Sequence, residues 1–263
     1  MMLIIIKLIL SVAMVLGLIY ISEKNSRLGG LFSGLPLSVG IFTYFNAKQN
    51  GVDFLVSSMP YAIAGFANMM LFTIAFYLGG KLFIKSRSLN TASALIIALI
   101  VYFISGYLVT LLDLSLLLGF VIFILSMIVS IIFFSQIPKN VNITKKSTSK
   151  PINGIIIIIF RIIFVSAVVL LITGVSGYVG HQWAGIFSSF PVMLASVITV
   201  LIFSYGDQIY PNVLKHFSYG VSTLVVYDLL IFWLYPAIGI NLGTIVAYII
   251  CFIYLLFLNK LNR

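Results

Sequence analysis

Apolar residues run through this chain in long stretches separated by short polar segments. A helix needs roughly 20 consecutive apolar residues to cross the hydrocarbon core of a bilayer. The pattern predicts nine such helices, with boundary errors of about two to four residues, and eight or ten are the alternatives. They cover residues 2–21, 31–47, 53–79, 89–108, 113–135, 154–177, 184–204, 211–234 and 238–258. Residues 89–135 are too long for one helix, and Gly106 with Asp113 marks the predicted turn, which Asp113 is expected to cap.

The composition decides what kind of protein these stretches build. Hydrophobic residues make up 62% of the 263 residues and charged residues only 8%, whereas soluble domains are about 25% charged. Uninterrupted runs of Ile, Leu, Val and Phe favour helices over a transmembrane β-barrel, in which polar and apolar residues alternate. We therefore predict an all-α polytopic membrane protein in a lipid bilayer. Residues 1–20 could pass for a signal peptide, but Lys7 interrupts the run and no small-residue cleavage signal follows, so we expect a retained first helix.

The basic residues predict an orientation, because Lys and Arg concentrate in the cytoplasmic loops of membrane proteins. The formal net charge is +10. With the N-terminus outside, twelve of the fifteen basic residues fall on the cytoplasmic side, namely Lys24, Arg27, Lys81, Lys85, Arg87, Lys139, Lys145, Lys146, Lys150, Lys215, Lys260 and Arg263. Only Lys48 falls in an outer loop, while Lys7 and Arg161 lie within helices. We expect a multi-pass protein of the cell membrane with a cytoplasmic C-terminus. Charge scattered over short loops does not fit a nucleic-acid partner.

Two parts of the chain share glycine and proline positions at a constant offset of 155 residues. Residues 30–36 (GLFSGLP) match residues 185–191 (GIFSSFP), and the match continues from Gly51 to Gly206 and from Gly65 to Gly220. Gly and Pro fix backbone geometry, so their agreement favours a duplication over chance similarity between apolar segments.

The repeat and the helix count together predict an inverted architecture. Residues 1–111 form the first membrane repeat and residues 154–263 the second, joined by a connecting helix at 112–135 and a cytoplasmic linker at 136–153. Five helices precede the second repeat, so it enters the membrane upside down relative to the first. Inverted repeats occur in many secondary transporters, because their two halves open to opposite sides.

The segment from Ala184 to Pro191, followed by Gly206 and Gly220, resembles the GlpM-like family of small, roughly four-helix membrane proteins. The segment from Gly29 to Pro36, with Gly51 and Gly65, is a looser second copy, and the resemblance covers about 50 residues in each half. It implies that the chain is two such units fused through one helix. The resemblance implies no catalytic or binding residue.

Prolines inside two matched helices are the first candidates for a functional site. Pro36 and Pro191 lie about six residues into their predicted helices, and each lacks the N–H that would bond the carbonyl four residues before it. Ser33 and Ser188 could satisfy the freed backbone groups. Matched interruptions in two halves point to a transporter site, whereas the alternative is that both kinks only shape helix packing.

Polar residues inside the predicted helices are the second group of candidates. Asp228 is the acidic residue deepest within a helix, and the repeat aligns it with Thr73. An intramembrane carboxylate favours a proton or cation site, or a partner for Arg161 or Lys7. Arg161 itself either lines the substrate path or extends to the interface. Asn68 is a candidate for the path or for a hydrogen bond between helices.

These features lead to two hypotheses about function. The first is a small secondary transporter or permease for a small molecule or ion, working by alternating access between inverted repeats. The second is a non-transporting scaffold or accessory subunit of an envelope-related complex. The sequence is also compatible with a homo-oligomer. We expect no enzyme, because Asp228 has no second carboxylate of an aspartyl protease and neither histidine accompanies a Gly-x-Ser-x motif. His181, His216 and the lone Cys251 lack the spacing of a metal site, and no cofactor is expected.

Overall fold

The computed structural model of the chain describes residues 35–82, 87–137, 177–192 and 210–261, with the single positions 17, 163, 171, 174, 175, 194, 195, 198 and 202. Within these ranges the chain is entirely helical, without a strand. Nearly all of the predicted helices at 2–21 and 154–177, and most of the linker at 136–153, lie outside the described residues.

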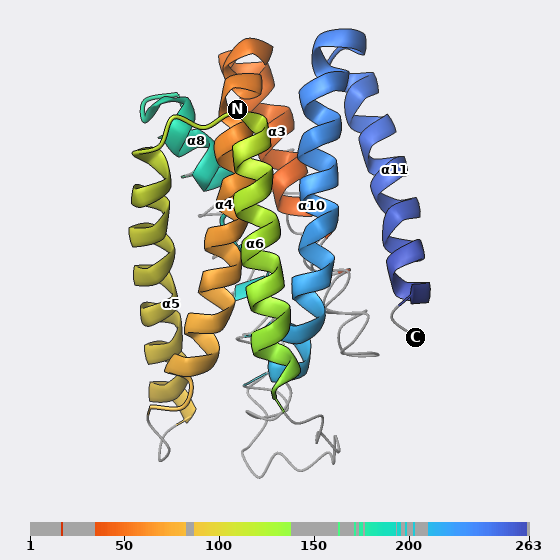
Figure 1. The fold of residues 1–263 in the computed structure, drawn as a ribbon. Coiled ribbons are helices and arrows are strands. Elements are labelled where there is room, and N and C mark those ends of the chain that lie inside the picture. The colour runs from red at the N-terminus through yellow and green to blue at the C-terminus, as the bar shows by residue number, and fades with distance from the viewer. Residues whose placement is uncertain are drawn as a thin grey trace.

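In the described part of the chain, seven helices form one elongated bundle (Figure 1). They are α3 (Leu37–Asn50), α4 (Val52–Gly79), α5 (Arg87–Thr110), α6 (Leu116–Ser135), α8 (Gly180–Ser188), α10 (Tyr210–Ile238) and α11 (Ile240–Leu261). Five of them, α4, α5, α6, α10 and α11, are long and apolar enough to cross a membrane. The chain is thus a helical protein of the multi-pass membrane type, as its composition predicts.

Helix α4 is the centre of the bundle. Of its most apolar stretch, 83% is buried, against 17% in α6 and 22% in α11. The outer helices turn large apolar side chains to the surroundings; Leu117 on α6 is 74% exposed and Leu242 on α11 is 60% exposed. So much exposed apolar surface is unstable in water but is what lipid covers.

The helices run in both directions between two ends of the bundle (Figure 1). At one end lie the α3–α4 turn, the α5–α6 loop, the start of α8 and the α10–α11 turn. At the other end lie the α4–α5 connection, the end of α6, the start of α10 and the end of α11. Gly51 (φ 94°) and Gly239 (φ 83°) make the two tight turns, because this left-handed conformation is strained for a residue with a Cβ.

The loop between α5 and α6 corrects one expectation. The sequence predicts Asp113 as the cap of this turn, but the Ser115 hydroxyl accepts the backbone N–H of Leu118, at 3.2 Å, and is the N-cap of α6. Asp113 lies two residues before Ser115, and its side chain is exposed. Serine and aspartate are comparably good caps, so position relative to the first helical residue decides between them.

Candidate functional site

The first candidate site lies where α3 begins, at Pro36. The N–H of Leu37 donates to the carbonyl of Leu35, at 2.7 Å, and the N–H of Gly40 donates to the carbonyl of Pro36, at 2.7 Å. With φ −74° and ψ 46° at Pro36, this is an inverse γ-turn, a three-residue turn closed by one hydrogen bond. The proline therefore starts a helix at the point where the sequence predicts the interior of one. We call this interruption of the predicted helix the Pro36 break.

The second candidate site lies after α8, at Pro191, and repeats this geometry. The N–H of Val192 donates to the carbonyl of Phe190, at 2.8 Å, and the N–H of Ala195 donates to the carbonyl of Pro191, at 2.9 Å. Both bonds fall 155 positions after their counterparts at Pro36. The predicted helix at 184–204 is broken after Ser188, so the expectation of a kink inside a continuous helix is wrong. The proline can neither donate a bond nor fit behind the carbonyl four residues earlier.

Serine hydroxyls satisfy carbonyls at the end of α8. Ser188 Oγ donates to the carbonyl of Gly185, at 2.6 Å, and Ser189 Oγ donates to that of Ile186, at 2.7 Å. The sequence singles out Ser188, and its bond is to its own helix. Its counterpart Ser33 lies outside the described residues.

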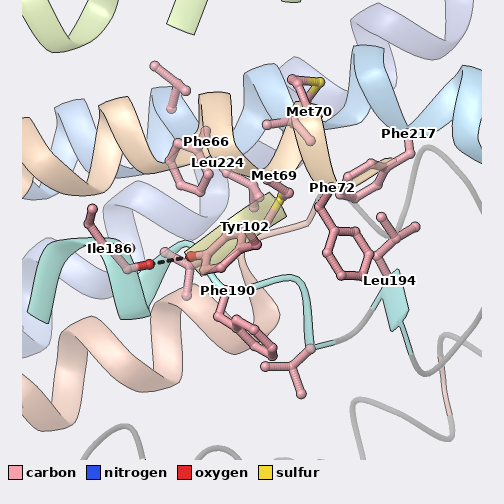
Figure 2. Packing of buried hydrophobic residues seen from close by; sticks show 14 of the residues in the cluster. Phe66, Met69, Met70, Phe72, Tyr102, Ile186, Phe190, Leu194, Phe217 and Leu224 are labelled. Carbon is pink, nitrogen blue, oxygen red and sulfur yellow. Dashed lines mark hydrogen bonds between the residues drawn. The ribbon is translucent and has the colours of Figure 1, made fainter. Parts of the chain in front are cut away.

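Two tyrosines that sequence reasoning missed hold the two breaks. Tyr248 on α11 donates its hydroxyl to the carbonyl of Pro36, at 2.8 Å. Tyr102 on α5 donates to the carbonyl of Ile186, at 2.5 Å, and lies 3.0 Å from Ser189 Oγ (Figure 2). Each bond joins a break in one half of the chain to a helix of the other half. The only sequence signal was a tyrosine within an apolar run, which is also typical of core packing.

Glycines allow the close approach at both breaks. A methyl group at Gly40 would overlap the hydroxyl of Tyr248. A methyl group at Gly65 on α4 would overlap Ser189 Oγ and lie 3.0 Å from Ser189 Cβ. Gly65 belongs to the repeated glycine pattern, and its role here is close packing of α4 against the end of α8.

A group of hydroxyls lies beside the Pro36 break, between α3, α10 and α11. Tyr227 and Thr43 are joined by a hydrogen bond of 3.2 Å, and Tyr235 and Thr244 by one of 2.7 Å. The rings of Tyr227 and Tyr248 lie 5.3 Å apart. This hydroxyl cluster (Thr43, Tyr227, Tyr235, Thr244 and Tyr248) fixes α3 against the α10–α11 pair.

Asp228 is fully buried in the middle of α10. Its exposed fraction is 0%, and among the described residues neither carboxylate oxygen has a hydrogen-bond partner. Its repeat counterpart Thr73 is also buried, but the Thr73 hydroxyl bonds the carbonyl of Met70 in its own helix, at 2.7 Å. The predicted partners Arg161 and Lys7 lie outside the described residues.

Asn68 lies deep in α4, near the second break. It is 1% exposed, and its Nδ2 has no hydrogen-bond partner in the part of the chain that the structure describes. The predicted hydrogen bond to another helix is therefore not seen there. A methyl group at Gly106 on α5 would lie 3.6 Å from this Nδ2 and 3.1 Å from Ile186 Cγ2, which places Asn68 beside the last turn of α8.

The surroundings of the second break are otherwise apolar. Figure 2 shows Tyr102 in the buried apolar cluster that also contains Phe66, Met69, Phe190 and Leu224. The Tyr102 and Phe190 rings meet edge to face at 5.2 Å. No group of three metal-ligating side chains occurs among the described residues. The site is therefore a set of helix breaks and isolated polar groups in an apolar interior.

No family model matches the chain, and no curated protein and no solved structure is significantly similar to it. The GlpM-like resemblance thus stays a prediction from the sequence pattern.

Proposed function

We propose that this chain is a small secondary transporter of the cell membrane, in which two inverted halves give alternating access to a path between the breaks at Pro36 and Pro191. The observation that carries the proposal is the pair of matching breaks: two backbone hydrogen bonds at one proline recur at the other with the same offset. Interrupted helices in corresponding positions of two halves are the usual place for a transporter site.

The directions of the helices support the inverted arrangement. Helix α4 runs toward the end of the bundle that holds the α4–α5 connection, whereas its counterpart α10 runs away from that end (Figure 1). The second matched pair, α5 and α11, also runs in opposite directions (Figure 1). Copies related by an axis in the membrane plane must have such reversed directions.

Charge supports the orientation with the N-terminus outside. Lys81 follows α4, Lys215 lies in the first turns of α10 and Lys260 ends α11, so all three lie at one end of the bundle. The end of α3 that carries Lys48, the start of α4 that carries Asp53 and the α5–α6 loop that carries Asp113 all lie at the other end. By the positive-inside rule the first end faces the cytoplasm.

The bonds of Tyr102 and Tyr248 support a two-state mechanism. Each break is fixed by one hydroxyl from the other half, and a buried hydrogen bond is worth about 0.5–1.5 kcal/mol net. Breaking one such bond costs little enough for a reversible change, since minor states of transporters lie within a few kcal/mol of the major one. Both bonds are present in the described state, and movement of one half against the other would release one break at a time.

Labelling at the two breaks tests the proposal without a known substrate. In a Cys251→Ser background, Leu35→Cys and Phe190→Cys occupy matched positions and are treated with a membrane-impermeant maleimide from either side of oriented vesicles. Alternating access predicts that holding one break open, by prior labelling, lowers the labelling rate of the other. Independent, fixed rates at both positions, together with a stoichiometric partner in purified samples, would favour the scaffold instead.

A further inference from the structure

Asp228 lies far from both ends of its helix. Ten residues separate it from Ile238 at the end of α10, which is about 15 Å along the axis. The side chain is fully buried, and no described hydroxyl or amide donates to either carboxylate oxygen. An ionised carboxylate without a partner is too costly in such a place, so with the described residues alone around it the group holds either a proton or a cation.

A metal cation would need several more oxygen ligands around the carboxylate. Helix α10 is unbroken from Tyr210 to Ile238, so most of its carbonyls are used within the helix. Within the helix, Pro236 lacks the N–H that would bond the carbonyl of Phe232. Side chains on a helix lean toward its N-terminus, so the carboxyl lies over the turn before Asp228, while the Phe232 carbonyl lies beyond the turn after it.

Other oxygens of the interior are also out of place for a metal site. The Thr223 hydroxyl is buried and has no partner among the described residues, but five residues along a helix put it about 140° around the axis from Asp228. The carbonyls of Pro36 and Ile186 at the breaks accept tyrosine hydroxyls. The described residues therefore offer no oxygen cage for a metal ion at this carboxyl.

Among the described titratable groups on α10 and the helices packed against it, none is a cation that pairs with the Asp228 carboxylate. On α11, Cys251 is the group close enough to interact with it electrostatically, and on α10 itself Tyr227 is its neighbour. Helix α6 carries no titratable side chain. The remaining groups on α3, α4, α10 and α11 are Tyr44, Lys48, Asp53, Tyr61, Tyr77, Tyr210, Lys215, His216, Tyr219, Tyr235, Tyr248, Tyr254 and Lys260. Of the lysines, Lys215 is the nearest in sequence on α10, about 20 Å away along the axis.

We infer that Asp228 is a proton-binding site and not a metal-ion site, so that the ion exchanged during the proposed transport is H⁺. The carboxylate takes up one proton to form the neutral acid, and it releases that proton when the bundle rearranges and water reaches it. The identification of this proton as the coupling ion rests on the proposed function. The binding of the proton itself does not.

Infrared spectroscopy of the full chain in lipid tests the inference directly. The carbonyl stretch of a protonated carboxylic acid is separate from the carboxylate and amide bands, and the chain has only five acidic residues. At neutral pH the wild-type chain is expected to show this band, Asp228→Asn to lack it, and the exposed control Asp113→Asn to keep it. Isotopic labelling of aspartate in the wild-type chain assigns the band to aspartate without any variant.

The choice of cation separates a proton from a metal ion. Replacing choline chloride by NaCl or LiCl at constant pH is expected to leave the band unchanged. A band that disappears with Na⁺ or Li⁺ would overturn the inference, as would its absence from the wild-type chain at neutral pH, which would indicate an ion pair. The band and the labelling experiment can also disagree. If the band is present but labelling of Leu35→Cys and Phe190→Cys does not alternate, the result would support the proton site and contradict the transporter.

Discussion

At the scale of single residues, the polar groups of this interior fall into two kinds. Tyr102, Tyr248 and the serines after α8 use their hydrogen-bonding groups at a helix break. Asp228 and the Asn68 amide nitrogen, by contrast, are buried without a partner among the described residues. Groups of the first kind stabilise the fold, and unpaired groups destabilise it unless they have a role. This contrast separates structural from functional candidates.

Removing the hydroxyl of Tyr248 should free the start of α3. Tyr248→Phe loses the bond to the Pro36 carbonyl and is expected to lower the free energy of unfolding by about 1 kcal/mol, because that carbonyl keeps the N–H of Gly40. Denaturant unfolding in detergent measures this loss.

The matched control is Tyr254→Phe on the same helix, which removes a bond to Ser222 away from either break. Both variants should lose similar stability, but only Tyr248→Phe should raise the labelling rate of Leu35→Cys. Equal labelling in the two variants would show that the Pro36 break does not depend on the tyrosine.

At the scale of helices, the sequence predicts the long elements well and the interrupted ones poorly. The predicted boundaries 53–79 and 89–108 lie within two residues of α4 and α5, because hydrophobic length sets a spanning helix. The predicted helix 184–204 fails at Pro191, where the structure has a break. An apolar run shows how much of the chain is buried. It does not show whether a neighbouring helix donates a hydroxyl hydrogen bond that stabilises a helix break.

The same limit explains what was found and missed at the candidate site. Pro36 and Pro191 could be identified because proline has a fixed effect on the backbone. Tyr102 and Tyr248 could not, because their role depends on contacts across 84 and 212 residues of sequence. The sequence predicts Asp113 as the cap that Ser115 provides, because the apolar pattern does not define the first residue of α6.

The contact between α4 and the end of α8 gives a prediction about helix packing. Gly65→Ala should reduce the free energy of unfolding by about 1–3 kcal/mol, because the new methyl group would overlap Ser189. In a Ser189→Gly background the nearest remaining atom is Ile186 Cα, at 3.5 Å, so the same substitution should cost much less. Unfolding of the four chains of this cycle measures the coupling.

Gly79→Ala is the control on the same helix. Its methyl group would lie 2.9 Å from Ala94 Cα on α5, a contact that Ser189 does not make. Its cost should therefore be the same with and without Ser189→Gly. An undiminished cost of Gly65→Ala in the Ser189→Gly background would mean that α4 and α8 do not meet as described.

At the scale of the whole molecule, the central claim is that two related halves lie in opposite directions across the membrane. The apolar surfaces of α5, α6 and α11 require a lipid environment for the described bundle whatever its activity. The transporter proposal needs more, namely the reversed orientation of matched segments. The proton at Asp228 adds a coupling ion but does not replace this requirement.

Site-specific labelling of the two matched loops tests that claim most directly. In the Cys251→Ser background, Asn25→Cys and Tyr178→Cys mark the two loops, Asp113→Cys marks the end of the bundle that holds the α5–α6 loop, and Leu82→Cys marks the opposite end. An impermeant maleimide applied to intact cells should label Tyr178→Cys and Asp113→Cys, while Asn25→Cys and Leu82→Cys should react only when the membrane is opened. Labelling of Asn25→Cys and Tyr178→Cys from the same face would contradict the inverted halves, and with them the proposed mechanism.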